Sequence, residues 1–138
     1  MSNLSYLVLL VDRTHARMVV LQNGAVIRKK DSKPDDVPQK VKHGDDTWDS
    51  QDKIFRHIED HLHRHLVHVG KDTAQLIKQY PVSGIFIGSH RTLFSKIENH
   101  IPYPYINMVK GRFVTELKMP WNDILKLAKK RISIYEKG

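Results

Sequence analysis

Five histidines within residues 57–68 are the densest group of side chains in this sequence that could do chemistry. Projected at 100° per residue, four of them share one side of a helix, which is the spacing that paired metal ligands use. The His-Glu-x-x-His pattern is absent, and no third ligand can be placed. We therefore expect a solvent-facing polar row and no bound metal, with added positive charge below neutral pH as an open alternative. The group comprises His57, His61, His63, His65 and His68.

Three carboxylates offer a second possible chemistry. Asp12 ends an apolar run near the amino terminus, Glu59 lies in the histidine-rich stretch, and Glu116 ends a later run. Two-metal nucleases with a ribonuclease H-like sheet hold magnesium on acids that converge from such places. Acids at strand ends are also common because they favour turns and solubility, and we favour that simpler reading. The neighbours Ser89 and His90 give no triad geometry, because adjacency in sequence does not aim one side chain at the other.

A third feature is the long polar segment of residues 33–48, which contains two prolines and a local basic cluster. A segment of this kind inside a compact domain is either a working loop or a solvated connector. We treat residues 31–50 as a basic loop that could contact a polyanion, and Trp48 as a ring that could stack on a base. The candidate RNA-binding residues are Lys40, Lys42, His43, Gly44, Trp48, Arg56 and Arg64. A second basic cluster near the carboxyl end comprises Lys126, Lys129, Lys130 and Arg131.

Charge and composition bound the class of protein. The 138 residues carry a net charge of +8, with 40% hydrophobic and 28% charged residues. These values fit one soluble globular domain, and the calculated pI of about 9.7 favours an anionic partner such as RNA. No apolar run is long enough to span a bilayer. The absence of cysteine excludes disulfides and thiolate metal sites, which is compatible with a cytoplasmic location.

The elements that would position these residues begin with three strands. Residues 4–11 form a near-continuous apolar run, which predicts a strand buried on both faces. Residues 16–21 and 25–29 predict two more strands, and Asn23-Gly24 between them is a typical hairpin turn. Three strands joined by tight turns predict an antiparallel meander over residues 4–30.

The rest of the chain alternates between helices and strands. Apolar residues at helical spacing from Phe55 to Val69 predict a core-facing helix, which Gly70 is expected to end. The further elements expected are a short helix at 73–80, a strand at 82–88, a helix at 93–100, a loop at 101–105, a strand at 112–116 and a helix at 121–134. The prediction is a single α/β domain over residues 1–138, with a mixed five-stranded sheet.

This order of elements, together with short stretches of local sequence, resembles the middle domain of the archaeal and eukaryotic class I translation termination factor. The Pelota-type and bacterial release-factor-like relatives belong to the same group. The matching sequence is Val37-Pro38-Gln39-Lys40, Lys42-His43-Gly44 and Phe55-Arg56-His57-Ile58, followed by residues 82–89, 113–116 and 121–125. The resemblance covers nearly the whole chain. It implies a cytoplasmic protein that works with the ribosome, ribosomal RNA or tRNA, without a cofactor.

One departure from the family pattern concerns catalysis. The family releases peptides with the glutamine of a Gly-Gly-Gln loop, and here the corresponding stretch reads Gly44-Asp-Asp-Thr-Trp-Asp-Ser-Gln51. No glycine precedes Gln51, and the three aspartates would repel phosphates. We therefore expect an RNA-binding domain of the termination or rescue type without release activity. The alternatives are a peptidyl-tRNA or other ester hydrolase that uses Gln51, and a protein-interaction module whose basic charge serves solubility.

Overall fold

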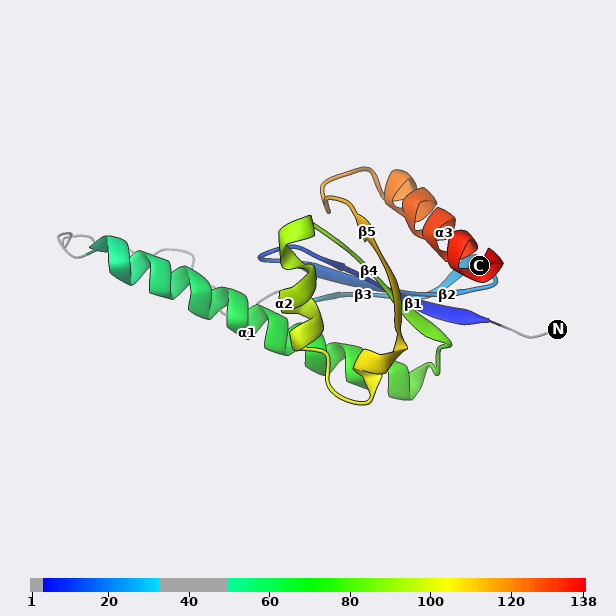
Figure 1. Ribbon diagram of the computed structural model, residues 1–138, viewed down its shortest axis with the longest axis horizontal. Helices are drawn as coiled ribbons and strands as arrows, with labels where there is room; N and C mark the ends of the chain where they lie inside the picture. Colours follow the sequence, from blue (N-terminus) through cyan, green and yellow to red (C-terminus); the bar gives the residue numbers. More distant parts are fainter. Residues whose placement is uncertain (1–3, 33–49) are drawn as a thin grey trace.

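The computed structural model describes residues 4–32 and 50–138, and the first of these two ranges forms the predicted three-stranded meander (Figure 1). Strand β1 spans Ser5–Val11, β2 spans Ala16–Gln22 and β3 spans Ala25–Ser32. Both strand pairs are antiparallel. The β2–β3 turn has φ of 52° at Asn23 and 84° at Gly24, which is why an Asn-Gly pair suits it.

The elements after residue 50 complete a mixed sheet. Helix α1 spans Ser50–Gln79, β4 spans Gly84–Ser89, α2 spans Phe94–Asn99, β5 spans Val109–Val114 and α3 spans Trp121–Lys137. Two short 3-10 turns, η1 (Arg91–Leu93) and η2 (Tyr105–Met108), precede α2 and β5. The strand order is β3-β2-β1-β4-β5, and β4 and β5 run parallel to the neighbours that precede them. The predicted α/β class and five-stranded sheet are therefore confirmed.

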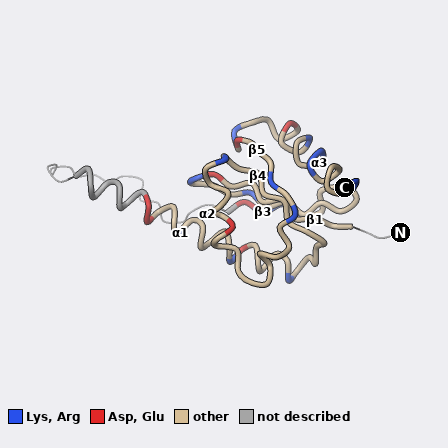
Figure 2. The backbone as a smooth tube through the Cα atoms, in the orientation of Figure 1, with Lys and Arg blue, Asp and Glu red and all other residues tan. Residues whose placement is uncertain are grey.

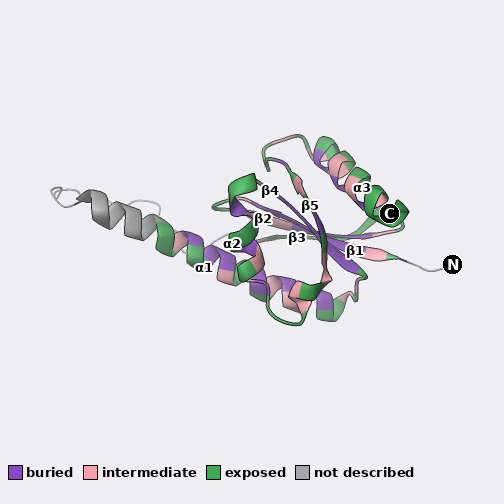
Figure 3. Cartoon of the chain, in the orientation of Figure 1, coloured by how far each residue is buried: buried purple, intermediate pink, exposed green. Residues whose placement is uncertain are grey.

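Helices cover both faces of the sheet, α1 and α2 on one and α3 on the other (Figure 1). Strand β1 lies in the middle, where Leu7 and Leu9 join the core beneath α1 while Val8 and Leu10 join the core beneath α3. Strands β1 and β4 are consequently buried along almost their whole length (Figure 3). Burial on two faces explains why the run at residues 4–11 shows no polar alternation.

Gly70 does not end the first helix, contrary to the prediction, because α1 continues through it to Gln79. The residues predicted as a separate short helix belong to its last turns. Gly70 is buried, and a Cβ built on it would lie 2.1 Å from the carbonyl oxygen of His100. The glycine therefore allows α1 to pack directly against the chain that leaves α2, and this contact offsets its low helix propensity.

The last strand also differs from its predicted bounds of 112–116. Strand β5 pairs with β4 from Val109 onward, and the ladder ends when the Thr115 amide donates to the Ser89 carbonyl at 3.1 Å. Glu116 consequently lies beyond the strand, in the connection to α3. Pairing with β4 sets where β5 begins and ends, and the periodicity of the β5 sequence alone does not show which residues pair.

Candidate functional site

Only some of the predicted RNA-binding residues lie in the part of the chain that the structure describes. Five of them, Lys40, Lys42, His43, Gly44 and Trp48, lie outside the described residues. Gln51 and Arg56 lie in the helical backbone of α1, in a stretch whose side chains are not described. Arg64 is exposed on α1.

The charge of the chain resides mainly in the described domain. Residues 33–49 contain three lysines and five aspartates and so have a net charge of −2. Because the whole chain has a net charge of +8, the residues outside this segment have a net charge of +10. The cluster at Lys40 and Lys42 is locally basic, but the segment around it is acidic overall. Lysines and arginines are spread over the sheet edge, the connections and α3 (Figure 2). The folded surface is therefore the stronger candidate for contact with a polyanion.

Helix α1 carries a row of basic and polar side chains along its solvent side. The members are spaced by three or four residues, which places them one above another on a helix, and all are exposed. Two acids lie near the row: Asp60 is exposed one turn before it, and Asp72 pairs with Lys30 of β3 at 3.4 Å. We call this row the α1 stripe, and it comprises Arg64, His68, Lys71, Gln75 and Lys78.

The α1 stripe reaches the edge of the sheet at its carboxyl end. There Lys78 and Gln75 line a shallow groove of about 440 Å³ together with Arg28 and Lys30 of the edge strand β3. Arg28 is exposed, so its guanidinium extends the positive surface from the helix onto the sheet. Sequence reasoning did not find this surface, because it joins residues from two distant segments.

The second predicted basic cluster, on α3, is only partly available. Lys126, Lys129 and Lys130 are exposed. Arg131 instead has a structural role: its Nε donates to the Arg112 carbonyl at 3.2 Å, and its guanidinium lies 5.9 Å from the centre of the Phe86 ring. Three of the four cations therefore face solvent.

The histidines do not form one solvent-facing row. His65 is buried with 3% of its surface exposed, and its Nε2 lies 3.0 Å from the Asp12 carbonyl and 3.2 Å from that of His15. His63 is exposed, and its Nδ1 lies 3.2 Å from Nε2 of His100. No set of three potential metal ligands comes together among the described residues. Of the four histidines in this group whose side chains are described, His63 and His68 are exposed as predicted, whereas His61 is half-buried and His65 is buried.

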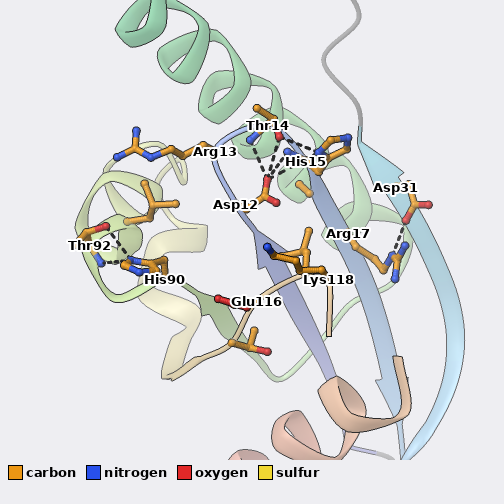
Figure 4. Close-up of a pocket in the computed structure, with 14 residues that line it drawn as sticks. Asp12, Arg13, Thr14, His15, Arg17, Asp31, His90, Thr92, Glu116 and Lys118 are labelled. Atoms are coloured by element: carbon orange, nitrogen blue, oxygen red, sulfur yellow. Dashed lines mark hydrogen bonds and ion pairs between the residues drawn. The ribbon is translucent and has the colours of Figure 1, made fainter. Parts of the chain in front are cut away.

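A pocket of about 710 Å³ lies outside the carboxyl ends of β1, β4 and β5 (Figure 4). We call it the carboxyl-edge pocket. Its walls are the β1–β2 turn with the start of β2 (residues 12–17), Asp31, the segment after β4 (His90, Thr92 and Leu93) and the segment after β5 (residues 115–118). Asp12 and Glu116 both line it, as the ribonuclease H-like alternative required, but Glu59 does not.

Two polar groups near this pocket have structural partners. Asp12 Oδ1 accepts from the amides of Thr14 at 2.8 Å and His15 at 2.6 Å, so this oxygen stabilises the β1–β2 turn. The Ser89 hydroxyl is fully buried and donates to the Val11 carbonyl at 2.6 Å. Ser89 is therefore no nucleophile paired with His90, whose Nδ1 instead contacts the Thr92 side chain at 3.1 Å.

Burial shifts two pKa values in ways that matter for packing. Burial lowers the pKa of His65 below its usual range, although the Asp12 and His15 carbonyls oppose that shift. Burial, followed by the hydrogen bond to Glu136, raises the pKa of Tyr6 to about 12. The Tyr6 hydroxyl donates to Glu136 Oε2 at 2.9 Å and so joins β1 to the end of α3.

Trp121, at the start of α3, was not singled out by its sequence context. Its ring lies 5.2 Å from the Arg17 guanidinium carbon and 4.8 Å from the Lys29 ammonium. These cation–π contacts tie α3 to β2 and β3. Within the described ranges no helix is both long enough and apolar enough to cross a membrane.

Comparison with known proteins places the chain in a family. The crystal structure of an archaeal translation termination factor matches with a TM-score of 0.60 and 12% identity, over 96% of this chain and 40% of that one. The Aquifex aeolicus Ppx/GppA phosphatase, type II variant, matches with a TM-score of 0.51 and 10% identity, over 83% of this chain and 37% of that one. At these identities both likenesses concern the fold, and the chain spans less than half the length of either protein. No curated protein matches the sequence. The model of one family matches residues 2–131, and the chain belongs to that family, bacterial archaeo-eukaryotic release factor family 10.

Proposed function

We propose that this release-factor-type domain binds ribosomal RNA or tRNA through the α1 stripe, in the cytoplasm, and has no peptide-release activity of its own. The observation that carries the proposal is the alignment of exposed cations along α1 in a domain of net +10. A translation-factor family supplies a setting in which the abundant polyanion is RNA. This reading places the main contact on the folded helix and leaves a supporting role for Lys40 and Lys42.

The length of the α1 stripe suits a nucleic-acid backbone. Arg64 and Lys78 are 14 residues apart, and a rise of about 1.5 Å per residue separates them by roughly 21 Å. A strand with one phosphate every few ångströms could therefore contact Arg64, Lys71 and Lys78 together. His68 lies between them, and its exposed ring can donate a hydrogen bond to a phosphate oxygen.

The absence of release activity is supported by the position of Gln51. Its backbone lies in the first turn of α1, whereas release requires a loop flexible enough to approach the ester. The sequence provides no preceding glycine and has Asp45, Asp46 and Asp49 nearby. Helical constraint and local negative charge therefore both act against the hydrolase alternative.

A charge-removal experiment tests the RNA-binding surface. Replacing Arg64, Lys71 and Lys78 by Ala should weaken cosedimentation with ribosomes. Each phosphate contact releases about one counterion on binding, so the slope of the logarithm of the binding constant against the logarithm of the salt concentration should fall in magnitude by up to about three. The three side chains are exposed, so the fold should survive, as circular dichroism would verify. Binding should be measured at low and moderate salt.

The matched control removes the same charge from the opposite face of the sheet. Lys126, Lys129 and Lys130 are equally exposed on α3, and their replacement by Ala should cost clearly less affinity. Equal losses in the two triple variants would mean that net charge alone drives association. Unchanged binding in the α1 variant would refute the assignment of the α1 stripe.

A further inference from the structure

The carboxyl-edge pocket lies where open α/β sheets bind small molecules. Three strands of this sheet run parallel (β1, β4 and β5), and their carboxyl ends meet at this pocket. Ligands of α/β sheets bind outside such ends, because the loops there provide polar groups on a rigid base. A volume of about 710 Å³ falls within the range of ligand pockets, roughly 300–1,000 Å³.

The pocket offers two exposed cations that can contact an anionic group of a ligand. Arg17 and Asp31 neutralise each other at 2.9 Å, and one Asp12 oxygen is held by two backbone amides. Arg13 and Lys118 are exposed cations without an ion pair among the described residues. Glu116 is exposed and likewise forms no ion pair with a described residue. With Asp12 counted, the three cations and three acids of the lining balance, so an anionic group would be bound locally, by the two exposed cations on two different walls, Arg13 and Lys118.

The remaining wall groups suit a ligand that is only partly charged. Thr14 and Thr92 offer hydroxyl groups, while Leu93 and Leu117 contribute apolar surface. Glu116 and Lys118 come from the segment after β5 and lie across the pocket from the β1–β2 turn that carries Arg13 (Figure 4). An anionic group of the ligand would thus lie between Arg13 and Lys118. The Glu116 carboxylate and the two leucines would contact the rest of the ligand.

The pocket is also formed before any ligand arrives. Asp12 Oδ1 fixes the β1–β2 turn from within, and the buried His65 holds the Asp12 and His15 carbonyls from α1. Thr115 continues the sheet by its bond to Ser89, which fixes the start of the opposite wall. Walls that are already ordered lose little conformational entropy on binding.

We propose that the carboxyl-edge pocket binds a phosphorylated small molecule of mononucleotide size. Arg13 and Lys118 contact the phosphate, Glu116 accepts from hydroxyl or amino groups, and Leu93 and Leu117 pack against the apolar face of the ligand. This site is separate from the α1 stripe and does not rest on the proposed RNA-binding function. The same chemistry has two possible sources, a free nucleotide and the terminal nucleotide of an RNA strand.

The test uses the full chain labelled with ¹⁵N and adenosine monophosphate as the probe. Titration should shift the amide resonances of residues 12–17 and 115–118 in a saturable way. Adenosine, which lacks the phosphate, should bind at least about tenfold more weakly, because a charge-assisted contact contributes roughly that factor. The double variant Arg13→Ala, Lys118→Ala should lose a similar factor for the monophosphate, while the control Lys126→Ala should match the wild type.

Three results would overturn the proposal: no shift of the pocket amides at millimolar monophosphate, adenosine binding as tightly as its monophosphate, or unchanged affinity in the double variant. The Ala variant of the α1 stripe should bind the monophosphate normally, so failure of this site and failure of the RNA-binding surface are distinguishable. A short RNA ending in the same nucleotide separates the sources. Displacement of the monophosphate by that RNA indicates a strand terminus, and retention indicates a free nucleotide.

Discussion

His65 shows how one side chain joins the long helix to the carboxyl edge of the sheet. Its Nε2 faces two carbonyls of the β1–β2 turn, which assigns the proton to that nitrogen and leaves Nδ1 buried without a hydrogen-bond partner. A charged imidazole would have to place its second N–H at this buried position, where no acceptor lies. Burial consequently lowers the pKa of His65.

This lowered pKa predicts acid sensitivity. In the unfolded chain the pKa of histidine is about 6.5, so between that value and the lower folded pKa the unfolded state binds more protons. The contribution of His65 to stability is therefore complete above about pH 6.5 and is lost as the pH falls through the window below it. His65→Gln should remove this part of the pH dependence and should also cost about 1–3 kcal/mol near neutral pH through impaired hydrogen bonding.

Urea unfolding of both proteins between pH 5 and 8 measures the effect. The control is His68→Gln, because His68 lies on the same helix but is exposed, so its replacement leaves the buried contacts of His65 intact. A wild-type slope retained in His65→Gln would contradict the assignment. Helical spacing grouped His65 with the other histidines of the helix but could not show that the β1–β2 turn covers it, since that contact joins residues about 50 positions apart.

At the scale of elements, α1 shows both the strength and the limit of sequence prediction. Leu62, Leu66 and Val69 are buried as their spacing predicted, because helical periodicity is a local property. The end of the helix was wrong, because the role of Gly70 depends on a long-range contact with the chain after α2. Propensity describes an isolated helix, and tertiary packing overrides it here.

The Gly70 contact gives a prediction in which two effects oppose each other. Gly70→Ala would gain up to about 1 kcal/mol of helix propensity, but the new Cβ would lie 2.1 Å from the His100 carbonyl oxygen. Because that neighbour is backbone, relief requires movement of α1 against the α2 connection, at a cost of about 1–3 kcal/mol. We expect net destabilisation in urea unfolding, whereas Gln75→Ala, on the exposed side of α1, should be neutral or slightly stabilising. A more stable Gly70→Ala variant would show that the close approach is absent.

At the scale of the whole molecule, the sheet could be predicted and the pocket at its carboxyl edge could not. The meander followed from local signals: a two-face apolar run and an Asn-Gly turn. The carboxyl-edge pocket arises only when β4 and β5 align beside β1, which brings Asp12 and Glu116 to one place from opposite ends of the chain. Likewise, the α1 stripe joins Arg28 only after β3 and α1 have packed together.

The last prediction concerns what the whole domain does on the ribosome. The chain spans 40% of the length of the archaeal factor it resembles, so binding and catalysis have to be measured on this domain directly. Gln51→Ala should leave ribosome cosedimentation unchanged, because the side chain carries no charge. Release of labelled peptide from ribosome-bound peptidyl-tRNA should be near background for the wild type and the variant alike, beside a Gly-Gly-Gln factor as the positive control. The reason is that Gln51 lies in a helical turn next to acidic residues, which hinders its approach to the ester. Strong release by the wild type that disappears in Gln51→Ala would instead establish the hydrolase alternative, and Lys53→Ala in the same turn region would show whether the loss is specific to the glutamine.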